Sequence, residues 1–150
     1  MLATGFLFTL VTGPTAFGLS RTDLPTLRWT DPGAVRTALG LADGANVFRI
    51  DTAPLEAALR ALPAVAAADV SIQLPDAAVV VRIEERTPVL AWQVGDTRFL
   101  ADATGTIFAT VDTNAVLPQG VVVVEDRRTG AGAPLAIGAH LDAVDADVAT

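Results

Sequence analysis

The chain has 150 residues, of which 51% are hydrophobic, with a formal net charge of −7 at neutral pH and no cysteine. This length suits one domain or two small ones. The acidic balance argues against a nucleic-acid partner, because phosphates are bound by basic surfaces. The absence of cysteine excludes disulfides and thiolate chemistry, and it is compatible with either redox compartment.

The first twenty residues carry no charged side chain, and residues 1–11 are strongly apolar. A membrane-spanning helix needs about 20 mainly apolar residues, and Gly13-Pro14 interrupts this run. Three interpretations compete: the outer end of a transmembrane helix, a signal-peptide core that lacks its basic flank, and a buried helix of a soluble domain. We favour the first, over residues 1–15. We therefore expect either that Met1 is not the natural start or that the helix is incomplete.

Residues 17–24 show a weak alternation that predicts a first strand. A helix follows. Asp31 can cap its N-terminus and Pro32 fits its first turn, after which apolar residues recur at helical spacing. Gly40 and Gly44 suit the exit from this helix, because glycine adopts positive φ at little cost.

A second helix is expected from Asp51, with Pro54 in its first turn and Pro63 at its end. Four apolar residues occupy positions i, i+3, i+4 and i+7 of this segment and form one stripe: Leu55, Ala58, Leu59 and Leu62. Leu59 lies in the middle of the stripe. We therefore expect Leu59 in the core.

Residues 70–74 and 79–83 alternate between apolar and polar side chains around the turn residues Pro75-Asp76, which predicts a hairpin. Two helices can cover the apolar face of such a hairpin. The expected fold is α+β, with a three-stranded sheet and two helices on one face.

The pattern changes after Pro88. Residues 89–94 and 97–101 flank Gly95-Asp96, which is a two-residue hairpin signature and marks the start of an all-β region. The remaining expected elements are a turn at 102–105, strands at 107–108 and 121–124 (the latter buried), a loop at 126–134 and a helix that begins at Leu135.

Several short motifs stand in a fixed order along this chain. They are the two-helix unit with Gly44 and Phe48, then Leu62-Pro63-Ala64-Val65, Leu74-Pro75 and Glu85-Arg86-Thr87-Pro88. In this order they resemble the FtsQ/DivIB family of bacterial cell-division proteins, and residues 99–108 resemble the opening hairpins of that family's β domain. The resemblance covers roughly residues 17–108. Two features depart from it: no glycine follows the first strand near Leu24-Pro25-Thr26, and the β region is short.

The resemblance implies a POTRA-type β-α-α-β-β domain at residues 16–88, followed by a partial, possibly truncated all-β domain at 89–150 and preceded by a partial transmembrane helix or signal anchor at 1–15. It implies a non-enzymatic, single-pass membrane protein whose main domain is extracytoplasmic and which recruits septal proteins, including the FtsB/FtsL pair. Arg21 and Arg28 alone would put their flank in the cytoplasm; a basic tail before Met1 would remove this conflict.

Partners of such a domain would add a strand to a sheet edge, where backbone groups lack partners. POTRA domains typically place the first strand of the hairpin at this edge. The expected partner-binding residues are therefore Val70, Ser71, Ile72 and Gln73. The alternative is that this edge is simply solvated.

Two other classes of function compete. A POTRA-containing outer-membrane assembly or secretion factor would be favoured by repeated POTRA units, which the sequence lacks. A small soluble enzyme would be favoured by titratable side chains gathered in a pocket. Glu84 and Glu85 are adjacent in a strand and point to opposite faces, so they do not form a catalytic pair. Neither Ser20 nor Ser71 lies in a Gly-x-Ser-x-Gly motif.

The sequence offers few metal ligands. His140 is the single histidine, and a His/Cys zinc site is excluded because cysteine is absent. Asp142, Asp145 and Asp147 lack the glycine and the terminal glutamate of a calcium loop, so a solvated, acidic helix start is expected there. We predict no enzymatic activity, no metal, no cofactor and no small-molecule substrate.

Overall fold

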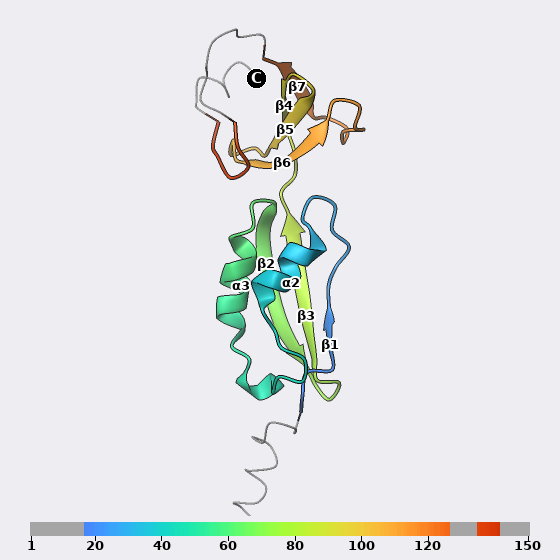
Figure 1. Ribbon diagram of the computed structural model, residues 1–150, viewed down its shortest axis with the longest axis vertical. Coiled ribbons are helices and arrows are strands. Elements are labelled where there is room, and N and C mark those ends of the chain that lie inside the picture. The colour runs from blue at the N-terminus through green and yellow to red at the C-terminus, as the bar shows by residue number, and fades with distance from the viewer. Residues whose placement is uncertain (1–16, 127–134, 142–150) are drawn as a thin grey trace, which may run out of the picture. The chain divides into compact units, whose positions relative to one another are not determined.

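The computed structural model describes residues 17–126 and 135–141, which form two compact units (Figure 1). The division between the units falls between Glu85 and Arg86, close to the domain boundary expected at Pro88. No helix in the described ranges has the length and apolar character needed to cross a membrane. The transmembrane helix expected at residues 1–15 lies outside the described residues.

The first unit has the expected β-α-α-β-β order. Its elements are β1 (Arg21–Asp23), α2 (Pro32–Leu39), the short 3-10 helix η1 (Val47–Arg49), α3 (Thr52–Arg60), β2 (Val65–Gln73) and β3 (Ala78–Glu85). The sheet order is β1-β3-β2, with β1 parallel and β2 antiparallel to β3. Both helices lie on one face of this sheet (Figure 1), which confirms the expected α+β arrangement.

Capping side chains fix where the two helices begin. The Asp31 carboxylate accepts a hydrogen bond from the backbone N–H of Ala34 (2.9 Å), and Pro32 is the first residue of α2. The Asp51 carboxylate does the same for Ala53 at the start of α3 (3.2 Å). Each bond satisfies a backbone donor that has no partner within its helix. Both helix starts predicted from the sequence are confirmed.

The core of the first unit lies between the two helices and the sheet. It is aliphatic, and its buried members come from all four main elements: Val35, Leu39, Leu59, Val70, Val79 and Val81. Leu59 is fully buried, as its central place in the stripe predicts. Val70, Val79 and Val81 alternate with residues on the opposite face of the sheet, because side chains of a strand point to alternate sides.

The first strand is shorter than the predicted range of residues 17–24. Only Arg21–Asp23 pair with β3. The residues before them pair elsewhere: Gly18 forms an isolated bridge with Asn46, and the Leu19 N–H donates to the Ala45 carbonyl (2.7 Å). Gly18 and Leu19 are therefore held by the loop that leads into η1, while the Ser20 N–H donates to the Ala77 carbonyl in the β2–β3 turn (2.9 Å).

The second unit is a four-stranded mixed sheet. Its strands are β4 (Leu90–Val94), β5 (Thr97–Ala101), β6 (Ile107–Asp112) and β7 (Val122–Glu125), in the order β6-β5-β4-β7. The β4–β5 hairpin turns at Gly95, whose φ is 57°, which confirms the Gly-Asp hairpin signature. The buried cluster on this sheet is Leu90, Trp92, Ala101, Ile107 and Leu141.

Two expectations for this unit are wrong. The strand near residues 121–124 exists as β7 but is not buried: Val122 and Val123 are 47% and 45% exposed, because β7 pairs only with β4 at the margin of the sheet. Residues 135–141 do not begin a helix. Gly138 has a φ of 90°, and its N–H donates to the Ile107 carbonyl (2.8 Å). Tertiary pairing with β6 therefore replaces helical hydrogen bonding in this segment.

Candidate partner-docking edge

The four residues expected to bind a partner lie together at the margin of the first sheet. β2 is an edge strand, because the sheet order is β1-β3-β2. Along β2, Val70 is buried, Ser71 and Ile72 are half-buried and Gln73 is exposed. The sheet therefore offers an edge at these positions, and partner binding there stays a prediction.

Only alternate residues of β2 direct their backbone groups to the open edge. β2 and β3 pair in antiparallel register, with Ser71 opposite Val80. In such a pair, successive residues point their N–H and C=O groups alternately at the partner strand and away from it. The Val70 N–H donates to the side chain of Glu56, outside the ladder (3.2 Å). The backbone N–H and C=O groups of Val70 therefore point away from β3, toward the open edge. Those of Ile72, two residues further along, point the same way.

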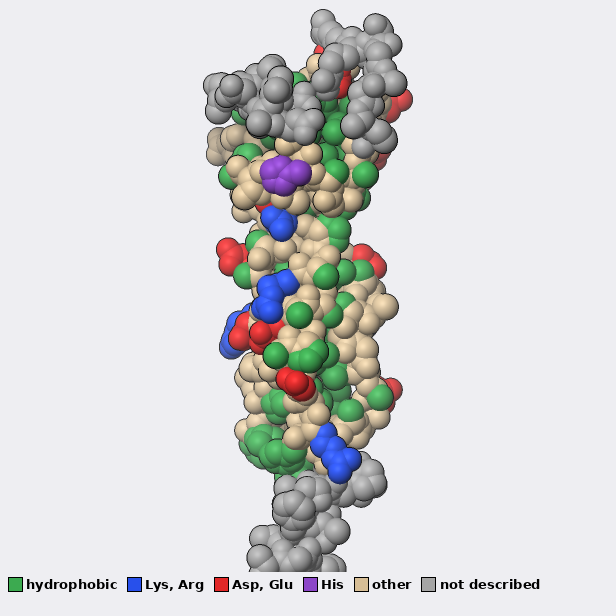
Figure 2. Space-filling view, turned by 90° about the vertical axis from the view of Figure 1, so that its left-hand side faces the viewer, with side chains coloured by type: hydrophobic (Ala, Val, Ile, Leu, Met, Phe, Trp, Pro, Cys, Tyr) green, Lys and Arg blue, Asp and Glu red, His purple; other side chains and the backbone are tan. Residues whose placement is uncertain are grey.

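Two side chains of α3 reach the same edge. Glu56 accepts from the Val70 N–H, and Arg60 donates to the Ala68 carbonyl (3.3 Å). The two side chains also form an ion pair, 3.5 Å apart. Sequence reasoning missed this pair, although an acid four residues before an arginine on a helix is a recognised signal of side-chain contact. In Figure 2, acidic and basic side chains lie against each other on the face that the view presents.

The sheet face opposite the helices is polar and carries a shallow hollow. Arg82 of β3 and Asp69 of β2 lie opposite each other and form an ion pair at 3.1 Å. The hollow has a volume of about 260 Å³ and is lined by Ala67, Ala68, Asp69, Arg82, Ile83 and Glu84. Asp69 and Arg82 neutralise each other's charge beside this hollow.

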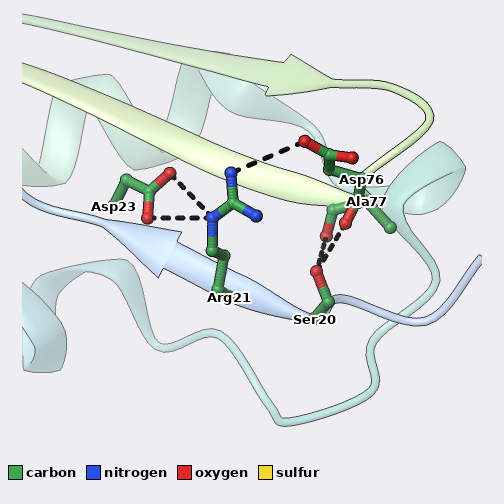
Figure 3. A network of polar contacts seen from close by, with 5 residues as sticks. All are labelled: Ser20, Arg21, Asp23, Asp76 and Ala77. Carbon is green, nitrogen blue, oxygen red and sulfur yellow. Dashed lines mark hydrogen bonds and ion pairs between the residues drawn. The ribbon is translucent and has the colours of Figure 1, made fainter.

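The other end of the sheet is tied down by a polar network (Figure 3). Arg21 of β1 bonds Asp23 (3.0 Å) and lies 3.7 Å from Asp76 in the β2–β3 turn. The Ser20 hydroxyl donates to the backbone carbonyls of Asp76 and Ala77. The hydrogen bond to Asp23 and its charge raise the pKa of Arg21. The network joins the start of β1 to the turn between β2 and β3.

Glu85 joins the end of β3 to the loop before α2. Its carboxylate accepts hydrogen bonds from three successive backbone N–H groups, those of Arg28 (2.7 Å), Trp29 (2.8 Å) and Thr30 (2.6 Å). Partial burial raises the pKa of Glu85, but these donors outweigh it and hold the pKa below its ordinary value. The arrangement positions a loop, a role that the sequence analysis did not assign to Glu85.

Arg86 and Asp102 form the corresponding polar anchor of the second unit. Their side chains are paired and mostly shielded, with 26% and 11% exposed. Asp102 also accepts from the backbone N–H groups of Thr104 (2.9 Å) and Thr106 (3.0 Å). Partial burial raises the pKa of Asp102, while the Thr104 hydroxyl, Arg86 and these N–H donors lower it by more. Asp102 therefore shapes the turn between β5 and β6.

The other candidate catalytic and metal-ligating residues do not lie together in one site. Glu84 is exposed while Glu85 binds the loop, so the two carboxylates act separately. His140 is exposed, and its Nδ1 lies 3.2 Å from the Leu141 carbonyl. Within the described ranges, no group of three or more His, Cys, Asp or Glu side chains could hold a metal ion. Asp142, Asp145 and Asp147 lie outside the described residues.

Comparison with known proteins identifies the family. Residues 27–86 match the family of POTRA domains of the FtsQ type. The chain is also 35% identical over 127 residues to the cell division protein FtsQ of Streptomyces collinus, an alignment that covers 83% of this chain and 47% of that protein. The chain belongs to the FtsQ/DivIB family. It spans about half the length of the FtsQ protein that it matches.

The matched POTRA range contains the features that position the edge. It begins in the loop bound by Glu85, runs through α2, α3 and β2, and ends at Arg86. β2 and the α3 side chains Glu56 and Arg60 therefore belong to the FtsQ-type POTRA domain itself.

Proposed function

We propose that this chain is part of a membrane-anchored, non-enzymatic cell-division protein that recruits other division proteins to the septum. Its family membership and the name of its Streptomyces relative support the role in division. The uncharged, apolar residues 1–11 lie ahead of the POTRA domain in the sequence and support an anchor in the cell membrane, with the POTRA and β domains outside the cytoplasm. By the family resemblance, the partners are division proteins of the FtsB/FtsL kind.

The edge of β2 is the surface that we propose for partner capture. The observation that carries this proposal is the outward N–H of Ile72, which has no hydrogen-bond acceptor among residues 17–126 and 135–141. An extended segment of a partner can accept this hydrogen bond and return one to the Ile72 carbonyl, without any special side chain on β2. Ser71 and Gln73 flank Ile72 and face the polar side of the sheet, where they would contribute to specificity.

The test is to remove one backbone donor and retain the fold. Ile72→Pro deletes the outward N–H, and an edge strand tolerates proline at such a position. The matched control is Ile72→Ala, which also loses the side chain but keeps the N–H. Capture of the septal partner proteins should be weakened by Ile72→Pro and much less by Ile72→Ala, with both variants folded by thermal melting. Equal capture by the two variants would mean that partners bind elsewhere.

A further inference from the structure

The open edge of β2 is not uniformly open. In its middle and end, three residues direct their backbone N–H and C=O groups away from β3: Ala68, Val70 and Ile72. They are alternate residues of the antiparallel pair with β3. Two of the three are already engaged by α3: the Ala68 carbonyl accepts from Arg60, and the Val70 N–H donates to Glu56. Among the described residues, no side chain forms such a hydrogen bond with the backbone of Ile72. The edge thus has a covered part and an uncovered part.

The two side chains that occupy the edge, Glu56 and Arg60, both belong to α3 and are easily displaced. Glu56 and Arg60 are four residues apart on α3 and pair at 3.5 Å. Their side chains are 25% and 47% exposed, so each can exchange its bond to β2 for water. A partly exposed ion pair between positions i and i+4 of a helix contributes little to stability. The Glu56–Arg60 pair therefore adds little to the stability of α3, and its larger effect is to restrict access to the edge of β2.

A partner strand needs the same backbone groups that the pair occupies. Strand addition satisfies the outward N–H and C=O groups of alternate residues in succession. A segment that pairs with Ile72 and continues along β2 in the direction of Val65 meets Val70 and then Ala68, where Glu56 and Arg60 stand. It can continue only if both side chains leave the edge.

We propose that Glu56 and Arg60 form a displaceable guard on the β2 edge, so that an extended protein segment starts to pair at Ile72 and must remove the guard to pair along the whole strand. This proposal rests on the proposed function of the β2 edge. The guard restricts capture to segments that bring enough contacts to compete with two hydrogen bonds. It also keeps exposed β2 edges of two copies from pairing with each other.

The first test measures the guard without any partner. In the full chain, Glu56→Ala with Arg60→Ala removes both side chains, and alanine retains the helix. Amide hydrogen exchange should then accelerate at Val70, which loses its acceptor, and stay unchanged at Ser71, which bonds to β3. The matched control is Arg36→Ala with Asp43→Ala, which removes one arginine and one aspartate at exposed positions away from the edge. Unchanged exchange at Val70 in the guard variant would overturn the proposal.

The second test measures capture of the septal partner proteins by the same variants. Loss of two competing hydrogen bonds should tighten capture about fivefold or more in the guard variant and leave it unchanged in the control. Adding Ile72→Pro to the guard variant should cancel the gain. If the guard variant captures no better than the unaltered chain while Ile72→Pro still weakens capture, the guard is overturned and the docking edge stands. If Ile72→Pro has no effect in either background, the docking edge fails and the guard proposal fails with it.

Discussion

The two units of this chain close their cores in different ways. In the first unit, all six buried residues of the main core cluster lie in a helix or strand, and α2 and α3 cover one face of the sheet. In the second unit, Leu141 completes the cluster on the sheet, although it lies outside any helix or strand. Its N–H donates to the Gly105 carbonyl (2.9 Å), next to the bridge between Thr106 and His140. The first core follows from local periodicity, and the second depends on a distant irregular segment.

Leu59→Ala tests the first half of this comparison and should have the largest effect. Leu59 is fully buried at the centre of the α3 stripe, so its truncation leaves a cavity and should cost about 2–5 kcal/mol of the free energy of unfolding. The exposed residue Leu74 supplies the control, since Leu74→Ala should change stability by no more than about 0.5 kcal/mol. Denaturant titration followed at the indole N–H signal of Trp29, in the first unit, measures both variants. A loss for Leu59→Ala as small as that of the control would contradict the assigned core.

Leu141→Ala tests the second half. Leu141 is 5% exposed and packs on Leu90, Trp92 and Ile107, so its truncation should destabilise the second unit by about 2 kcal/mol, the low end of the range for buried leucine. We expect a smaller loss than for Leu59, because an irregular segment can relax around the cavity. The indole N–H of Trp92, which donates to Asp126, reports on this unit. If the Trp92 signal melts as in the unaltered chain, residues 135–141 are not part of this core.

The same contrast explains how much of the structure the sequence predicts. Asp31 and Asp51 act on residues two or three positions away, and the stripe containing Leu59 has a helical period, so both helices follow from the sequence. The alternation around Pro75-Asp76 likewise predicts the β2–β3 hairpin, whereas the expectation that β2 lies at the edge came from the family resemblance.

Long-range pairing accounts for what the sequence does not predict. Glu85 binds the N–H of Arg28, 57 positions away, and no local pattern indicates such a contact. Gly18 pairs with Asn46 and so shortens the first strand, and Gly138 bonds to Ile107 where a helix was expected. In each case, a tertiary hydrogen bond decides the backbone path where local propensity is weak. The guard on the edge falls between these two cases, because the spacing of Glu56 and Arg60 is visible in the sequence but their position against β2 is not.

Glu85→Gln sharpens the comparison, because Glu85 anchors the first unit as Asp102 anchors the second. At neutral pH the loss of the charge on a carboxylate that accepts three N–H bonds should cost about 1–3 kcal/mol. The folded state holds the pKa of Glu85 below its ordinary value of 4.5. Its contribution is therefore complete above pH 4.5 and is lost as the pH falls from there through the lower folded pKa.

The stability difference between the unaltered chain and Glu85→Gln should accordingly shrink on acidification from pH 7 to pH 3. Unfolding titrations across this range, again followed at Trp29, measure it. Glu84→Gln is the neighbouring control and should change stability by less than about 0.5 kcal/mol at every pH, because Glu84 is exposed. A difference for Glu85→Gln that stays constant with pH would show that the carboxylate charge does not hold the loop.

Ala77→Gly addresses the smallest difference between the units, which lies in their turns. The second unit has glycine where φ is positive, at Gly95 and Gly105, whereas the β2–β3 turn has Ala77 at a φ of 48°, held by Ser20. A left-handed conformation costs an alanine about 1–2 kcal/mol, and glycine avoids this at an entropic cost of about 0.5–1 kcal/mol. Ala77→Gly should therefore stabilise the first unit by up to about 1 kcal/mol. Ala78→Gly, one residue on in the strand, should destabilise it instead. Thermal melting followed at Trp29 compares the two, and a loss in both variants would mean that Ala77 carries no backbone strain.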